Sequence, residues 1–99
     1  MANYRTSVTV SEVNGHCHIY QVGDSFTIDE DGQTLRLEKG NKMCILALAG
    51  LLPIFPALSK ELAEDDWMSA TTQVYQCIDP GPQRGGGGTV YFEVKREKV

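Results

Sequence analysis

Short stretches in which hydrophobic and polar residues alternate lie on both sides of one long apolar run in this chain. In the first stretch Val8 and Val10 alternate with threonine and serine, the pattern of a strand with one buried face. The same alternation predicts strands at about residues 5–13, 24–29, 33–38, 72–78 and 89–96. Between the second and third of these, Asp31 and Gly32 form a dipeptide typical of a tight hairpin turn.

The apolar run in the middle of the chain predicts the helical part of the fold. Every residue from 43 to 52 is apolar or glycine, which is typical of a helix that is buried on all sides. Gly50 within it indicates close packing against the sheet. Pro53 ends or kinks this helix, and Pro56 suits the first turn of a second one. The expected helices span about residues 42–52 and 55–63.

Together these elements predict a single α+β domain that covers residues 1–99. We expect a small antiparallel sheet, built from the N-terminal strands and a C-terminal hairpin, packed on a central buried pair of helices. Residues 79–88 include four consecutive glycines and are expected to form a long flexible loop. A strand rather than a helix follows these glycines, so they do not match a phosphate-binding loop.

Composition and charge narrow the classes of function. The chain is 41% hydrophobic and 22% charged, as in an ordinary globular protein. Its net charge of -4 and the lack of a basic stripe argue against binding to nucleic acid. The basic residues gather near the end, at Lys95, Arg96 and Lys98, where we expect them in solvent. The apolar run is too short for a membrane span and no secretory signal is evident, so we expect a cytoplasmic protein without membrane contact.

Three cysteines are the main candidates for chemistry. Cys17 follows the first turn, Cys44 begins the apolar run and Cys77 ends a strand. Thiols stay reduced in the cytoplasm, and three of them cannot all pair within one chain. Zinc and iron–sulfur sites usually show two Cys-x-x-Cys pairs, which this chain lacks. The residues alone leave two interpretations open, namely metal ligands brought together by the fold or small buried side chains.

Several short motifs resemble those of a family of small prokaryotic proteins. In chain order they are Val8-Thr9-Val10, Gly15-His16-Cys17, Val22-Gly23-Asp24-Ser25-Phe26, Cys44, Cys77-Ile78-Asp79-Pro80 and Phe92-Glu93-Val94-Lys95-Arg96. The chain thereby resembles an uncharacterised family of single-domain proteins of similar length with three spaced cysteines. The resemblance implies a histidine shortly after the first cysteine. Tyr20 stands nearest that position here, and the histidines of this chain are instead His16 and His18.

The resemblance implies that the three cysteines are a recurrent feature, and so favours a metal site. The sulfur ligands would be Cys17, Cys44 and Cys77. The first candidate for a fourth ligand is His18, followed by His16 and Asp79. Three cysteines with one further ligand fit a zinc ion or a [4Fe–4S] cluster. Such a site would also stabilise a small core.

We therefore expect a small non-catalytic accessory protein or subunit that binds a metal ion or iron–sulfur cluster through its three cysteines. Its partner would be a larger redox or metabolic enzyme. One alternative is a metal-free homo-oligomeric interaction module with an interface around Trp67, Tyr75 and Tyr91. A second alternative is a small thiol enzyme that uses Cys17.

Overall fold

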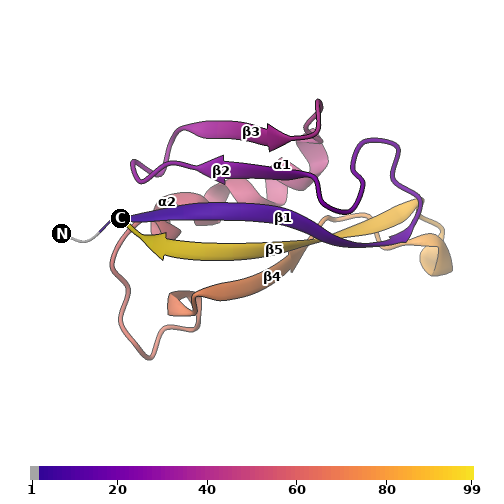
Figure 1. Ribbon diagram of the computed structural model, residues 1–99. Helices are drawn as coiled ribbons and strands as arrows, with labels where there is room; N and C mark the ends of the chain where they lie inside the picture. The colour runs from indigo at the N-terminus through magenta and orange to yellow at the C-terminus, as the bar shows by residue number, and fades with distance from the viewer. Residues whose placement is uncertain (1–2) are drawn as a thin grey trace.

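Five antiparallel strands form one sheet in the computed structural model, which describes residues 3–99 (Figure 1). The strands are β1 (Tyr4–Gly15), β2 (Ser25–Ile28), β3 (Leu35–Lys39), β4 (Thr72–Gln76) and β5 (Gly88–Lys98). Their order across the sheet is β3-β2-β1-β5-β4. The two long strands therefore pair at the centre, and the short strands β3 and β4 form the edges. The α+β class and the antiparallel sheet expected from the sequence are confirmed.

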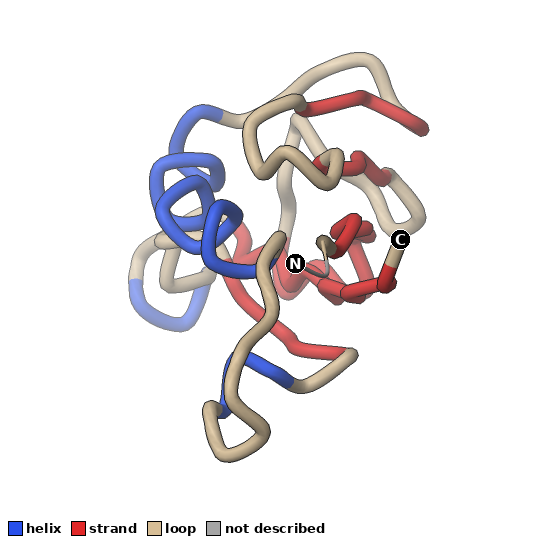
Figure 2. The backbone as a smooth tube through the Cα atoms, turned by 90° about the vertical axis from the view of Figure 1, so that its left-hand side faces the viewer, coloured by secondary structure: helices blue, strands red, loops and turns tan. Residues whose placement is uncertain are grey.

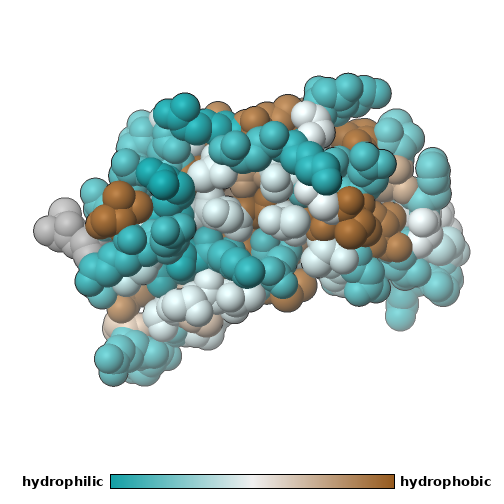
Figure 3. All heavy atoms as spheres, in the orientation of Figure 1, coloured by the Kyte–Doolittle hydropathy of each residue, from teal (hydrophilic) through white to brown (hydrophobic). Residues whose placement is uncertain are grey.

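The alternation of side chains gives the sheet one apolar face and one polar face. Val8 lies opposite Phe26 on β2 and Val94 on β5, and all three side chains are buried. The neighbouring residues, such as Thr9 and Glu93, point to the other face because successive side chains in a strand alternate. That other face is open, and Figure 3 shows mostly hydrophilic atoms on it.

A short helical segment covers the apolar face of the sheet (Figure 2). It consists of α1 (Ile45–Leu51), η1 (Leu52–Ile54) and α2 (Phe55–Leu58), which follow one another without a gap. Leu51, Phe55 and Leu58 are buried against the sheet. The ring of Phe55 meets the ring of Phe26 edge to face, with 6.1 Å between their centroids. Burial of these large side chains is the main source of stability for so small a core.

The expected pair of buried helices is not seen. Within residues 3–99 only α1 is longer than a single α-helical turn, and α2 has four residues. Pro53 and Pro56 lack a backbone N–H, so the regular hydrogen-bond ladder cannot pass through this stretch. After α2 the chain continues as loop and turn up to η2 (Trp67–Ser69). No helix among the described residues has the length and apolar character needed to cross a membrane.

Helix α1 is also not buried on all sides. It lies across the surface of the core, so only Ala47 and Leu51 are buried, whereas 79% of Ile45 is exposed. The expectation that Gly50 packs closely against the sheet is wrong, because a Cβ atom there would meet nothing within 4 Å. A uniformly apolar sequence has no period from which the buried side of a helix could be read.

Arg96, near the end of β5, is buried rather than solvated. Its guanidinium donates hydrogen bonds to the carbonyl oxygens of Leu58 at 3.0 Å, Lys60 at 2.6 Å and Ser69 at 3.1 Å. The ring of Tyr4 lies against it, with 4.0 Å from the ring centroid to the guanidinium carbon. Arg96 thus ties the helical segment and the following loop to the end of the sheet.

Candidate functional site

The three cysteines line one cavity of about 510 Å³, which we call the thiol pocket and whose lining includes Cys17, Cys44, Cys77, His16 and His18. Strands β1 and β4 both run antiparallel to β5, so both finish at the end of the sheet where β5 begins. Helix α1 starts over this same end of the sheet, and its N-cap residue is Cys44. The topology therefore gathers cysteines that are far apart in the sequence.

Cys77 forms the inner wall of the thiol pocket. It directly follows β4 and is 9% exposed. Its Sγ accepts a hydrogen bond from the backbone N–H of Val90 at 3.2 Å and lies 3.9 Å from the carbonyl oxygen of Gly88. The thiol is thus held against the first residues of β5.

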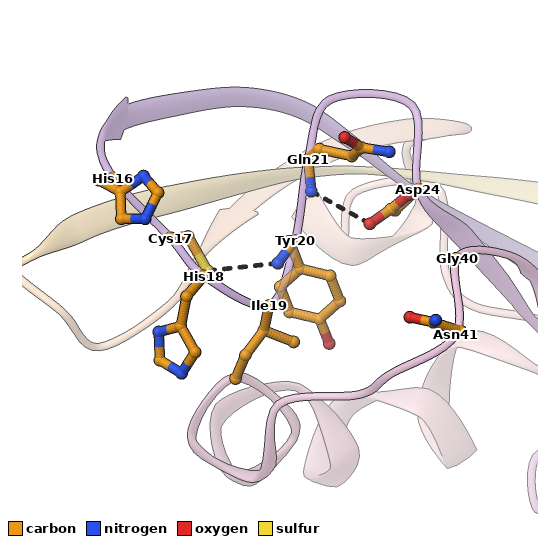
Figure 4. A pocket seen from close by; sticks show the side chains of 9 residues that line it. All are labelled: His16, Cys17, His18, Ile19, Tyr20, Gln21, Asp24, Gly40 and Asn41. Carbon is orange, nitrogen blue, oxygen red and sulfur yellow. Dashed lines mark hydrogen bonds between the residues drawn. The ribbon is translucent and has the colours of Figure 1, made fainter.

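Cys17 lies on the irregular segment between β1 and β2 and is half-buried. Its Sγ accepts a hydrogen bond from the backbone N–H of Tyr20 at 3.4 Å, drawn in Figure 4. His16 and His18 flank it and are exposed. Figure 4 shows both imidazole rings at the end of the segment away from Asp24. The sulfur atoms of Cys17 and Cys77 both accept a backbone N–H, and Cys17 is the more exposed residue of the two.

Tyr20 joins Cys44 to the segment between β1 and β2 that carries Cys17. The backbone N–H of Cys44 donates a hydrogen bond to the Tyr20 hydroxyl oxygen at 3.0 Å. The ring of Tyr20 is buried and meets the ring of Phe92 edge to face, with 5.5 Å between centroids. Burial raises the pKa of Tyr20 above its usual value, because the low-dielectric surroundings disfavour a phenolate. Tyr20 is thus a wall of the pocket, which the sequence analysis did not identify.

Two glycines allow the backbone to close the bottom of the pocket. Gly88 pairs with Gly15 where β5 meets β1. A Cβ atom on Gly88 would lie 2.5 Å from the carbonyl oxygen of His16, and one on Gly15 would lie 2.5 Å from the carbonyl oxygen of Gly87. Gly15 also has a φ of 97°, which favours glycine. The glycine run in the 79–88 loop therefore has a packing role beside the thiols.

Asp79 organises the loop between β4 and β5. Its carboxylate accepts hydrogen bonds from the backbone N–H groups of Gly81 at 2.9 Å and Gly87 at 3.2 Å. The hydrogen bond from Gly81 is the main reason why the pKa of Asp79 is lowered. The hydroxyl of Thr89 donates to the Asp79 carbonyl oxygen at 2.6 Å. Both carboxylate oxygens are thus engaged with the loop.

The described structure brings the candidate ligands to one cavity but does not place them as a coordination shell. Within residues 3–99 no group of three or more histidine, cysteine, aspartate or glutamate side chains has the spacing needed to hold a metal ion. A cysteine sulfur moves by rotation about one side-chain bond, so small rearrangements alter its position. Metal binding would therefore need the sulfur atoms to turn toward a common point.

A second cavity of about 650 Å³ lies on the other side of the Cys17 segment (Figure 4). Asp24 lines it and is 7% exposed. Its Oδ2 accepts a hydrogen bond from the backbone N–H of Gln21 at 3.0 Å, whereas its Oδ1 is buried without a partner among the described residues. In the sequence Asp24 stands at the start of a predicted strand, and that position does not reveal its burial.

The three aromatic residues expected to form an interface do not share one surface. Trp67 and Tyr75 lie together, with 6.4 Å between their ring centroids. Tyr75 is opposite Phe92, on the helix-covered face, whereas Tyr91 is opposite Gln76 and therefore points to the open face.

No pattern in the sequence marked Tyr20 as a wall of the thiol pocket. Tyr20 contacts both the Cys17 segment and Cys44. Its neighbours along the chain do not reveal that its ring is buried. Comparison of the chain with protein-family models, with curated proteins and with solved structures found no match.

Proposed function

We propose that the thiol pocket binds a zinc ion or an iron–sulfur cluster through Cys17, Cys44 and Cys77, and that the protein is an accessory subunit of a larger redox or metabolic enzyme. The observation that carries the proposal is that cysteines from three separate segments line one cavity. Thiolate sulfur is the ligand that zinc and iron–sulfur clusters prefer in proteins.

The surroundings of two sulfur atoms support this role. The Sγ atoms of Cys17 and Cys77 each accept a backbone N–H, from Tyr20 and from Val90. A cysteine must lose its proton to bind a metal, and N–H···S hydrogen bonds stabilise the negative charge that results. Hydrogen bonds of this kind also tune the metal or cluster once it is bound.

His18 is the first candidate for the fourth ligand. Both His18 and His16 line the thiol pocket, and both side chains are exposed. The carboxylate of Asp79 also lines the pocket, but two loop N–H groups already bind it. A neutral imidazole is a common ligand of zinc and replaces cysteine in some clusters. The two histidines therefore serve as matched variants in a test of the fourth position.

The apolar surface beside the pocket supports the accessory role. Leu46 and Ile78 line the cavity and are 55% and 65% exposed. Ile45 precedes Leu46 in α1 and is 79% exposed. Exposed apolar side chains that cluster next to a site are typical of surfaces that contact another protein. A partner enzyme docked there would lie next to the metal.

The direct test is elemental and sulfide analysis, together with a visible absorption spectrum. The full chain is purified without oxygen or chelator and then reconstituted once with ferrous iron and sulfide. We expect either stoichiometric zinc, or iron and sulfide with a broad visible band. Cys17→Ser, Cys44→Ser and Cys77→Ser should each lower the content to background. His18→Ala should weaken retention, and His16→Ala serves as its control.

A folded, colourless protein without metal after reconstitution would overturn the proposal. Circular dichroism of each serine variant separates loss of a ligand from loss of the fold. If the wild-type protein binds no metal but Cys17 alone reacts rapidly with an alkylating reagent at neutral pH, a thiol enzyme becomes the better interpretation.

A further inference from the structure

Strand β4 forms one edge of the sheet. Its pairing with β5 shows which of its backbone N–H and C=O groups point away from the sheet. The N–H of Arg96 donates to the carbonyl oxygen of Thr71 at 2.8 Å, and the N–H of Cys77 donates to that of Val90 at 3.0 Å. Hydrogen-bonded residues alternate along an antiparallel ladder, so the odd-numbered residues of β4 face β5. The residues whose N–H and C=O groups point outward are Thr72, Val74 and Gln76.

This edge lacks the charged residues and prolines that commonly prevent strand pairing. Within β4 no residue is charged and none is proline. Val74 is 64% exposed on the open face, and Trp67 is 69% exposed beside Tyr75 on the opposite side. Charged residues and proline are the common protection of exposed edges. The β4 edge therefore offers both backbone hydrogen-bonding groups and apolar side chains.

The other edge of the sheet, β3, is protected. It contains Arg36, Glu38 and Lys39, and the side chain of Arg36 pairs with Asp29 at 2.9 Å. Its exposed hydrophobic residue, Leu37, is 41% exposed and lies between charged neighbours. The two edges differ in their charge, so only β4 is suited to pairing.

We propose that β4 pairs with β4 of a second copy of this chain, antiparallel and about a two-fold axis at Val74. In this register Val74 faces Val74 of the second copy, and Thr72 faces Gln76. These are the residues with outward N–H and C=O groups, so each group gains a partner. The two sheets then continue into one.

The absence of charge on β4 and its self-complementary register favour a second copy as the occupant of this edge. The chain carries a net charge of -4, which opposes self-association, and an uncharged strand is where two copies meet the least of this repulsion. The nearest charged residues on the open face, Glu93 and Lys95, lie opposite Val74 and Thr72 and pair with each other at 3.4 Å. The self-complementary register leaves no like charges directly opposed.

The test is sedimentation equilibrium of the full chain over a range of concentrations. We expect a dimer whose dissociation constant rises about tenfold or more in Val74→Lys, because two lysines would then face each other across the axis. Val74→Glu should weaken the dimer for the same reason. An equal mixture of the two variants should restore it as a heterodimer. Leu37→Lys makes the same change on the β3 edge and should have no effect.

Amide hydrogen exchange supplies a second readout that does not depend on a variant. Protection of Thr72, Val74 and Gln76 should increase with protein concentration, whereas protection of β3 should not. A strictly monomeric wild-type protein would overturn the proposal. So would a dimer that Val74→Lys leaves intact, or a mixture of the two charged variants that remains monomeric.

Discussion

The hydroxyl oxygen of Tyr20 accepts a 3.0 Å hydrogen bond from the backbone N–H of Cys44, and this contact joins two walls of the thiol pocket. Tyr20→Phe keeps the ring against Phe92 but leaves that N–H without its partner. We expect a loss of about 1–2 kcal/mol in the free energy of unfolding, measured by urea denaturation. Tyr91→Phe is the control, because the Tyr91 hydroxyl forms no hydrogen bond within residues 3–99, and it should change little.

The buried Tyr20 also predicts a loss of stability at alkaline pH. Burial raises the pKa of Tyr20, so the folded state holds its phenolic proton to higher pH than the unfolded state does. The resulting stabilisation is complete below the ordinary tyrosine pKa of about 10 and is lost as the pH rises toward the folded-state value. Urea denaturation from neutral to alkaline pH should show this decline. Tyr20→Phe should make it shallower without abolishing it, since burial also raises the pKa of Tyr75.

The lowered pKa of Asp79 predicts that the protein also loses stability at acid pH. Hydrogen bonds from Gly81 and Gly87 lower the pKa of Asp79, so its carboxylate stabilises the folded loop above the ordinary aspartate pKa of about 3.9. That stabilisation is lost as the pH falls through the lowered folded-state value. Asp79→Asn should flatten this part of the acid unfolding curve. An identical acid transition in the variant and the wild type would show that Asp79 does not contribute.

Alanine substitutions at Gly88 and Gly50 should change the free energy of unfolding in opposite directions. Gly88→Ala forces a Cβ atom to within 2.5 Å of the His16 carbonyl oxygen, so we expect a destabilisation of about 2–4 kcal/mol. Gly50→Ala adds a Cβ in open space on α1 and should stabilise the protein by about 0.5–1 kcal/mol. Thermal and urea denaturation of both variants measure the difference. If both glycines tolerate alanine equally, the backbone approach at Gly88 is not needed.

Arg96→Lys should destabilise the protein by about 2–4 kcal/mol. A lysine cannot reproduce the forked guanidinium that serves the carbonyl oxygens of Leu58, Lys60 and Ser69, so buried acceptors lose their donors. Arg36→Lys is the matched control, since the side chain of Arg36 is 64% exposed and its ion pair with Asp29 lies at the surface. We expect that control to change the free energy of unfolding by less than about 1 kcal/mol.

Several features of the fold follow from local sequence patterns. Val8 and Val10 alternate with polar residues because a strand turns successive side chains to opposite faces, and one face here meets water. The α+β class could therefore be predicted. The helical segment could not be predicted correctly. Its apolar sequence carries no period, and the prolines at 53 and 56 interrupt it more than the pattern alone indicates.

The sequence by itself determined that this is a small sheet-based domain with three cysteines in separate segments. Only the tertiary structure decided that Cys17, Cys44 and Cys77 line one cavity, because strand order and the ends at which strands meet depend on pairing between distant segments. The tertiary structure also decided the place of Arg96, which the sequence predicted to lie in solvent and which is buried. The alternation of polar and apolar residues along a strand predicts to which face of the sheet a side chain points. Packing between distant segments decides what covers that face.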